Sequence, residues 1–266
     1  MTANFHTHTV FCDGKNTPEE IVLKAIEKGF SAIGFSGHGY TPFDLSYCMK
    51  DTEEYISEIH RLKERYKKDI EVYLGAEEDA FAPVDRSRFD YIIGSSHYVF
   101  VKGKYYAVDS GYDGFKKCLE SFDYDTLSFS EAYYSSFVNY IIDRKPDVIG
   151  HFDLITKYDE LDSSMFLEDE KYNLIAEKYI TKATQANCIF EVNTGAVSRG
   201  LRKTVYPFEN LLYILKRNNA RVMLSSDSHK IDTLDYGFTE AKKILHNIGF
   251  RHLYTLRDNK FVKYDI

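Results

Sequence analysis

The chain of 266 residues is 44% hydrophobic and 28% charged, and its net charge is −7. This composition is ordinary for a globular protein with a substantial core, and no run of about 18 apolar residues is present that would span a membrane. There is also no dense Lys/Arg tract, which argues against tight binding to a nucleic-acid backbone. Because residues 1–16 lack a basic segment followed by an apolar one, we expect no export signal and a cytoplasmic location.

Seven short runs of β-branched, aromatic and other apolar residues recur along the chain, and most are followed by a longer amphipathic segment. Such short apolar runs are typical of parallel strands that are covered on both faces. We predict strands over Asn4–Thr7, Ala32–Ser36, Glu71–Gly75, Tyr91–Gly94, Val148–Gly150, Cys188–Val192 and Arg221–Ser225.

Amphipathic helices are predicted between most of these strands. Thr17 can cap a helix that has Pro18 at its first position and Glu20 at its third. Stripes of apolar residues with charged residues opposite them predict three further helices. These helices are expected over residues 55–66, 174–186 and 208–217.

Two segments fall outside this alternation. Residues 98–146 form the longest insertion, which starts with a predicted hairpin over Val99–Val108, and residues 253–266 end the chain as a second hairpin. Repeated strand–helix units predict a parallel sheet, and we expect the seven units to close into a (β/α)7 barrel that forms one domain over residues 1–266. An open doubly wound sheet is the alternative, but no Gly-rich phosphate loop follows any predicted strand.

Histidines and carboxylates follow six of the seven predicted strands. The carboxyl ends of parallel barrel strands meet on one face, which is where such barrels carry their active sites. Six of the nine histidines lie at these ends, whereas random placement would put about one there. The candidate metal ligands are His6, His8, Asp13, His38, Glu77, His97, His151, Asp227 and His229.

The number of candidates argues for more than one metal ion. His6 and His8 occupy positions i and i+2 of a strand and so share a face, as two ligands of one ion require. A catalytic metal takes three or four protein ligands, so the full set implies about two or three ions. Without metal, so many imidazoles and carboxylates would face desolvation and repulsion. We expect His60, His246 and His252 to lie outside the site.

Three further polar positions near these strand ends are not among the candidate ligands. Glu78 and Asp79 follow Glu77 directly, and either one of them faces the substrate or they are solvated. The sixth predicted strand leads to Asn193, which has no histidine nearby. We therefore expect that strand to contact the substrate rather than a metal.

The stretches from His6-Thr7-His8-Thr9 to Asp13-Gly14, Asp90–His97 and Ile149–Ile155 resemble the polymerase and histidinol phosphatase (PHP) family, most closely its histidinol-phosphatase branch. The resemblance covers nearly the whole chain and implies a distorted (β/α)7 barrel with three divalent ions, which would be zinc, manganese or iron. Gly37 departs from it, since many relatives have an acidic residue there. The resemblance implies that one ion is held by His6, His8, Glu77 and Asp227, a second by Glu77, His97 and His151, and a third by Asp13, His38 and His229.

The resemblance also implies a reaction, the hydrolysis of L-histidinol phosphate to L-histidinol and phosphate in histidine biosynthesis. The residues alone imply only a small phosphomonoester. Asp227 and His38 are the expected catalytic residues, with Asp227 orienting the attacking water or accepting its proton. Arg199 is the expected phosphate-binding cation, because a guanidinium matches phosphate geometry, and Arg202 and Lys203 are its rivals. The alternatives are a phosphoesterase for another small ester or nucleotide and a non-catalytic metal-binding domain.

Overall fold

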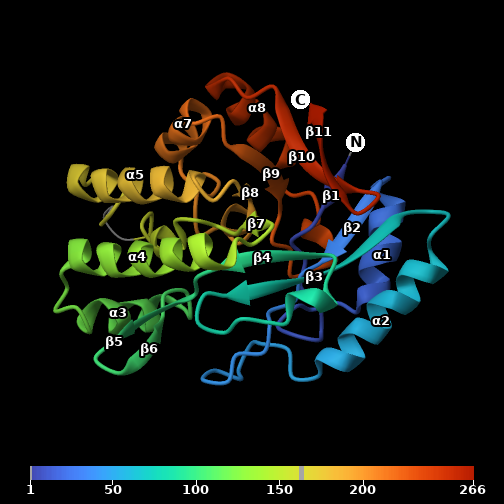
Figure 1. The fold of residues 1–266 in the computed structure, drawn as a ribbon, viewed down its shortest axis with the longest axis horizontal. Coiled ribbons are helices and arrows are strands. Elements are labelled where there is room, and N and C mark those ends of the chain that lie inside the picture. Colours follow the sequence, from blue (N-terminus) through green and yellow to red (C-terminus); the bar gives the residue numbers. More distant parts are fainter. Residues whose placement is uncertain (1, 162–164) are drawn as a thin grey trace.

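The computed structural model describes residues 2–161 and 165–266 and contains seven parallel strands that follow one another in chain order (Figure 1). Each strand pairs with the next one in parallel. All seven predicted strands are present, although the first is shorter than predicted and the third extends to Asp79. The strands are β1 (Ala3–Asn4), β2 (Ala32–Phe35), β3 (Glu71–Asp79), β4 (Tyr91–Ser95), β7 (Val148–Ile149), β8 (Ile189–Asn193) and β9 (Arg221–Ser225).

The sheet closes into a distorted barrel between its first and last strands. Beyond the ends of β1 and β9, the His8 N–H donates to the Ser228 carbonyl at 2.8 Å, and the Ser228 N–H donates to the His6 carbonyl at 3.1 Å. β3 is long because residues 71–74 pair with β2 whereas residues 75–79 pair with β4, a stagger that strand tilt in a barrel requires. The predicted (β/α)7 barrel is confirmed, and the open sheet is wrong.

Helices fill most connections between the strands. Thr17 caps α1 as predicted, since its hydroxyl accepts from the Glu20 N–H while the Glu20 carboxylate accepts from the Thr17 N–H. None of the helices in the described ranges is long and apolar enough to cross a membrane. The helices are α1 (Pro18–Glu27), α2 (Thr52–Arg65), α3 (Tyr112–Glu120), α4 (Thr126–Arg144), α5 (Glu170–Thr184), α6 (Gly195–Ser198), α7 (Glu209–Arg217) and α8 (Phe238–Ile248).

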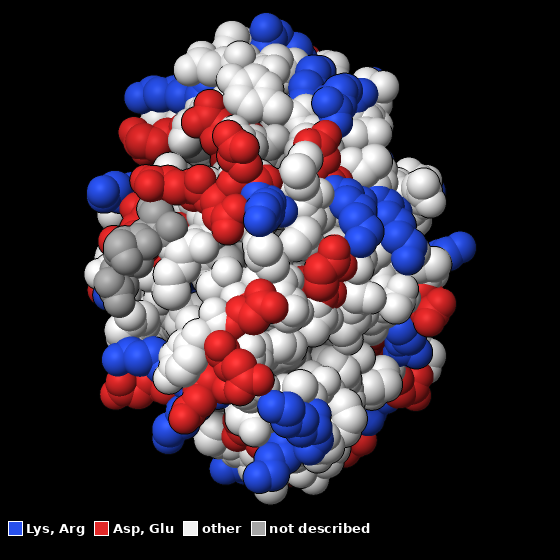
Figure 2. All heavy atoms as spheres, turned by 90° about the vertical axis from the view of Figure 1, so that its left-hand side faces the viewer, with Lys and Arg blue, Asp and Glu red and all other residues white. Residues whose placement is uncertain are grey.

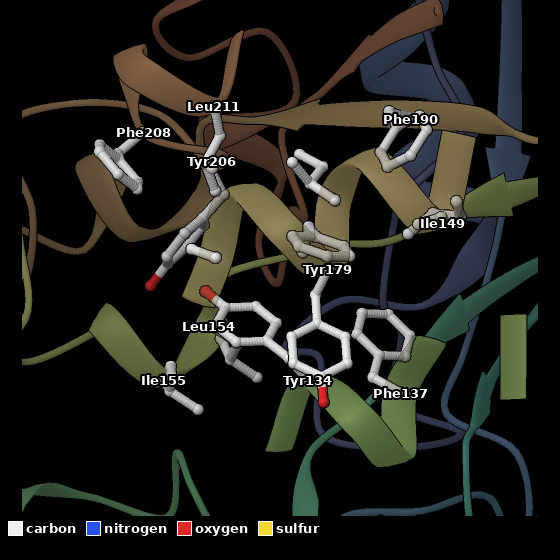
Figure 3. Packing of buried hydrophobic residues seen from close by; sticks show 14 of the residues in the cluster. Tyr134, Phe137, Ile149, Leu154, Ile155, Tyr179, Phe190, Tyr206, Phe208 and Leu211 are labelled. Carbon is white, nitrogen blue, oxygen red and sulfur yellow. The ribbon is translucent and has the colours of Figure 1, made fainter. Parts of the chain in front are cut away.

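The segment over residues 98–146 starts with the predicted hairpin. Its antiparallel strands are β5 (Tyr98–Val101) and β6 (Lys104–Ala107), and α3 and α4 follow them. The sequence does not predict α4, because apolar and aromatic residues occupy much of its circumference instead of a single stripe. Figure 3 shows the consequence: Tyr134 and Phe137 of α4 pack with Tyr179 of α5 among the buried side chains outside the barrel.

The C-terminal hairpin covers the amino ends of the barrel strands. It consists of β10 (His252–Arg257) and β11 (Lys260–Asp265), and Figure 1 shows it beside the N-terminus. Leu256 is 2% exposed and packs in the same cluster as Tyr73 and Met223, which fill the barrel. The Asp258 N–H donates to the carboxylate of Glu71, the first residue of β3. The hairpin therefore closes the barrel at the end opposite to the carboxyl ends of its strands.

Removing the Leu256 side chain is expected to destabilise the fold. Leu256→Ala should lower the free energy of unfolding by about 2–5 kcal/mol, because it leaves a cavity at the base of the barrel. Val262→Ala is the control, since Val262 lies on the same hairpin and is 38% exposed. Urea denaturation of both variants measures the difference, and equal midpoints would show that the hairpin does not support the barrel.

Candidate metal centre

All nine predicted ligands lie together at the carboxyl ends of the barrel strands. They form four overlapping groups, in each of which the potential ligand atoms lie within 4.8 Å of one another. The three other histidines are exposed and belong to none of these groups, as predicted. The groups are His8, Asp13, His38 and His229; His6, Glu77 and His151; His6, His8 and Asp227; and His38, Glu77 and His97.

The strand geometry explains why these side chains converge. Glu77 follows Tyr73 at even spacing along β3, so it points into the barrel as Tyr73 does. His6 and His8 continue the direction of β1 with the same two-residue spacing. The backbone bonds between this segment and Ser228 then hold Asp227 beside both histidines.

Glu77 is the centre of the cluster. Its Oε2 lies 2.9 Å from His38 Nδ1 and 3.3 Å from His6 Nε2, and its Oε1 lies 3.1 Å from His151 Nε2 and 3.3 Å from His97 Nε2. None of these contacts has the geometry of a hydrogen bond, and both oxygens lack a hydrogen-bond partner in the described ranges. Two fully buried lone-pair donors thus face a ring of imidazole nitrogens.

The cluster strongly perturbs the pKa values of its members. Burial by itself lowers the pKa of His6, but the carboxylates of Glu191, Glu77 and Asp227 outweigh it and raise that pKa well above its usual value. Burial raises the pKa of Glu77, but the neighbouring histidines hold it well below its usual range. Burial, together with His229 and His38, lowers the pKa of His8 to about 3. A buried carboxylate among imidazoles needs cations for charge balance.

These residues fit divalent metal ions. Six side-chain atoms of the cluster are buried without a hydrogen-bond partner in the part of the chain that the structure describes: His6 Nε2, His8 Nε2, Asp13 Oδ1, both Glu77 oxygens and His151 Nδ1. Buried polar atoms are otherwise almost always paired. Imidazole and carboxylate donors suit zinc, manganese and iron better than softer ions. Metal binding at this site therefore follows from unsatisfied donors as well as from residue type.

Two buried carboxylates that the sequence left without a metal-related role support the predicted ligands. Glu191, on β8, lies with its Oε1 2.5 Å from His6 Nδ1, and it also accepts a bond from the Ser225 hydroxyl. Asp79 Oδ2 accepts from the His97 N–H at 2.8 Å and lies 3.2 Å from His97 Nδ1. Carboxylates behind metal-binding histidines fix the ring orientation and raise ligand basicity.

The expectation that the sixth strand contacts substrate rather than a metal stays a prediction, but the sequence did not predict that Glu191 on this strand lies against the candidate ligand His6. The sequence does contain a signal for Glu191, because it is the one charged residue in the otherwise apolar predicted strand Cys188–Val192. The solvated alternative for Glu78 and Asp79 is wrong, because both are buried. Glu78 is paired with Arg144, whose Nη2 lies 2.7 Å from its Oε2.

The structure distinguishes Arg199 from its two rivals. Arg199 borders the cluster: its Nη2 donates to Asp227 Oδ2 at 3.0 Å. Gly195 makes this approach possible, since a Cβ there would lie 2.8 Å from that oxygen and 2.9 Å from Arg199 Nη2. Arg202 is buried and contacts other residues, and Lys203 is exposed. Asp227 itself has a φ of 47°, in the left-handed region that non-glycine residues adopt uncommonly and Asp more readily than most.

A cavity of about 510 Å³ opens onto the cluster, and it has two kinds of wall. One wall is the ligand cluster with Arg199. The other comes from the loop after β2, from the β5–β6 hairpin and the residues directly after it, and from the turn after β7, with Lys15 from the loop after β1. This second wall includes two carboxylates, Asp44 and Asp109, and two lysines, Lys15 and Lys157, that the sequence does not single out. The residues outside the cluster are Lys15, Asp44, Ser46, Tyr47, Tyr98, Ala107, Asp109, Ser110, Leu154, Lys157 and Arg199.

Fold and site together define a parallel α/β barrel with a candidate metal centre of histidines and carboxylates in an open cavity. Residues 4–195 match the PHP domain, and the chain belongs to the PHP family. The resemblance of the sequence motifs to this family is thus confirmed.

Curated relatives and solved structures cover almost the whole chain. A Schizosaccharomyces pombe protein named probable histidinol-phosphatase is 28% identical, with 95% of this chain and 89% of the relative covered. The Bacillus subtilis histidinol-phosphatase is 24% identical, with 88% and 95% covered. The histidinol phosphate phosphatase of Lactococcus lactis, complexed with zinc, L-histidinol and phosphate, has a TM-score of 0.68 at 19% identity, with 98% of each chain covered. At that identity, the structure supports the fold alone.

Replacing Glu191 is expected to weaken metal binding without removing a ligand. Glu191→Gln should reduce zinc affinity about 10–100-fold, because the neutral amide no longer fixes and polarises the His6 ring. Competition with a chromogenic chelator measures the affinity. Glu131→Gln is the control, since Glu131 contacts Lys178 and Tyr179, away from the cluster. Unchanged zinc affinity in Glu191→Gln would contradict this role.

Proposed function

We propose that the protein is a metal-dependent phosphomonoesterase that hydrolyses L-histidinol phosphate to L-histidinol and phosphate in histidine biosynthesis. The observation that carries the proposal is the complete set of nine candidate ligands, with unsatisfied buried donors, facing a cavity that also contains Arg199. The histidinol-phosphatase names of the curated relatives support the substrate. As a biosynthetic enzyme, it would act in the cytoplasm.

The proposed cofactors are three divalent ions, with zinc, manganese or iron as the occupants. They would be held by His6, His8, Glu77 and Asp227; by Glu77, His97 and His151; and by Asp13, His38 and His229. When bound, such ions lower the pKa of water and neutralise charge on phosphate oxygens. The close approach of these residues in overlapping groups supports the assignment, since His6, His8, His38 and Glu77 each belong to two groups.

The side chains of this protein would orient the reactants. Asp227 would position the attacking water or accept its proton, since its carboxylate lies in the cluster and is held by Arg199. His38, which contacts Glu77 and also lines the cavity, would assist at the same centre. Arg199 has about a third of its side chain exposed, so its remaining N–H groups are available to phosphate oxygens.

The second cavity wall fits the organic part of the proposed substrate. L-histidinol phosphate carries an ammonium group and an imidazole. Asp44 and Asp109 offer negative charge to that part, and Tyr47 and Tyr98 offer aromatic faces. On the face shown in Figure 2, Lys and Arg side chains occur in small groups separated by Asp and Glu. This mixed surface favours a small ester over a long nucleic acid on that face.

Metal content and turnover test the proposal directly. Elemental analysis of the purified protein is expected to find two or three divalent ions per chain, and phosphate release is expected to be fastest from L-histidinol phosphate. Other phosphomonoesters, nucleotides and oligonucleotides serve as the comparison panel. Faster hydrolysis of another ester would support metal-dependent phosphoester hydrolysis but would contradict a role in histidine biosynthesis. Metal content without any hydrolysis would support a non-catalytic metal-binding domain instead.

Removing the metals is expected to abolish turnover and to lower thermal stability. The ions would bind only the folded state and cross-link several strand ends, so their loss should reduce the melting temperature. Dialysis against a chelator followed by a thermal melt and a phosphate assay measures both effects. Addition of zinc, manganese or iron(II) should restore them. Full activity after verified metal removal would contradict a metal-dependent reaction.

Truncation of Arg199 is expected to impair the chemical step. Arg199→Ala should lower kcat/KM for L-histidinol phosphate about 10²–10³-fold, the usual effect of losing one donor to a developing charge. Arg217→Ala is the matched control, because Arg217 is exposed on α7 and contacts only Glu177 among the ion pairs described. An unchanged kcat/KM in Arg199→Ala would show that another cation binds the phosphate.

A further inference from the structure

We propose that Asp153 and Arg202 form a buried positioning pair that places Arg199 relative to the metal centre. This inference rests on the proposed function in one respect, namely that Arg199 binds phosphate. Arg202 Nη1 lies 3.5 Å from Asp153 Oδ2, and both side chains are completely buried. Neither residue lines the cavity, so the pair acts on the reaction through the segments that it joins.

Asp153 belongs to the turn after β7 that also forms part of the active-site wall. His151 precedes it by two residues, and Leu154 and Lys157 from the same turn line the cavity. Thr156 completes the connection: its hydroxyl donates to the Asp153 carbonyl at 2.8 Å and accepts from Arg202 Nη1 at 2.7 Å. Arg202 is therefore attached to this turn at two points.

Arg202 belongs to the loop that carries Arg199. The loop folds tightly after α6, where the Leu201 N–H and the Arg202 N–H both donate to the Ala196 carbonyl, at 3.0 and 3.4 Å. Arg199 lies within this turn, three residues before Arg202. Fixing the guanidinium of Arg202 thus fixes the turn from which Arg199 reaches Asp227.

The far end of the same loop is attached to Asp153 as well. The Phe208 N–H donates to Asp153 Oδ2 at 3.0 Å. Tyr206 exchanges backbone hydrogen bonds with Asn193 at the end of β8, and its ring lies 4.4 Å from the Arg202 guanidinium carbon. One carboxylate therefore holds both the middle and the end of the loop over residues 194–208.

The composition of the pair favours positioning over stability. Burying two charges carries a large desolvation cost, and apolar residues of similar volume often stabilise a core as well or better. Asp153 Oδ1 and Arg202 Nε are buried and have no hydrogen-bond partner in the described ranges. What the ion pair provides, and apolar packing does not, is a fixed direction between the two segments.

A double-mutant cycle between Arg202 and Arg199 tests this role. The variants are Arg202→Met, Arg199→Ala and the double variant, all loaded with metal and assayed with L-histidinol phosphate below their melting temperatures. Arg202→Met alone is expected to lower kcat/KM about tenfold with unchanged metal content. In the Arg199→Ala background, the same change should have less than about a twofold effect, because the group that it positions is already absent.

Two results of this cycle would contradict the proposal. An equal loss in both backgrounds would mean that Arg202 acts through general stability, and no loss in the single variant would mean that it does not act on the site; either result overturns the proposal. Tyr134→Phe is the control for a buried polar contact away from the cavity, since among the described residues it removes one side-chain hydrogen bond, the 2.7 Å bond to the Tyr172 hydroxyl. Its kcat/KM should match that of the wild type.

A second variant and a second measurement cover the cases in which Arg202→Met does not fold or the protein has no phosphatase activity. If Arg202→Met does not fold, Asp153→Asn replaces it in the cycle, because the amide keeps an oxygen for the Phe208 N–H and removes only the charge. If the wild-type protein hydrolyses no phosphomonoester, the proposed function fails separately. The same variants are then compared by the dissociation constant of inorganic phosphate, measured by calorimetry on the metal-loaded proteins. Arg202→Met is again expected to weaken binding in the wild-type background and to have little effect in the Arg199→Ala background.

Discussion

The seam between the first and last strands is the constraint on which the rest of the site depends. Two backbone hydrogen bonds join the His6–His8 segment to Ser228, and they bring the two ends of the barrel sequence into register. Candidate ligands lie on both sides of this seam. Closure of the barrel brings the candidate ligands together, and metal ions bound there would cross-link the strands that the seam joins. The fold and the site therefore share their stabilising interactions.

The charge distribution around Glu77 follows from that closure. A fully buried carboxylate is costly by itself, and here five histidines from four strand ends lie within 3.5 Å of it without forming hydrogen bonds. A second layer of carboxylates, Glu191 and Asp79, lies behind the rings. This two-layer arrangement fixes ring orientations before any ion binds. Carboxylates in this position direct metal-binding imidazoles and raise their basicity.

The two ends of the barrel have different tasks. At the amino ends of the strands, the β10–β11 hairpin places Leu256 against the barrel interior and seals it with apolar contacts. At the carboxyl ends, the connecting loops stay open around a cavity of about 510 Å³. Arg199 and the second wall come from these loops, which buried polar contacts hold to the strands. Barrels of parallel strands commonly separate stability from chemistry in this way.

The sequence by itself determined the strands, their order and the nine candidate ligands, because strand periodicity is local and the ligands follow each strand within a few residues. Only the tertiary structure decided which side chains support them. Glu191 lies 185 residues from His6 in the chain, and nothing near it in the sequence indicates that contact. Arg199 and Arg202 are three residues apart and alike in type, and they differ only in the direction that the folded loop gives them. Such choices depend on contacts between distant segments, which exist only once the barrel has closed.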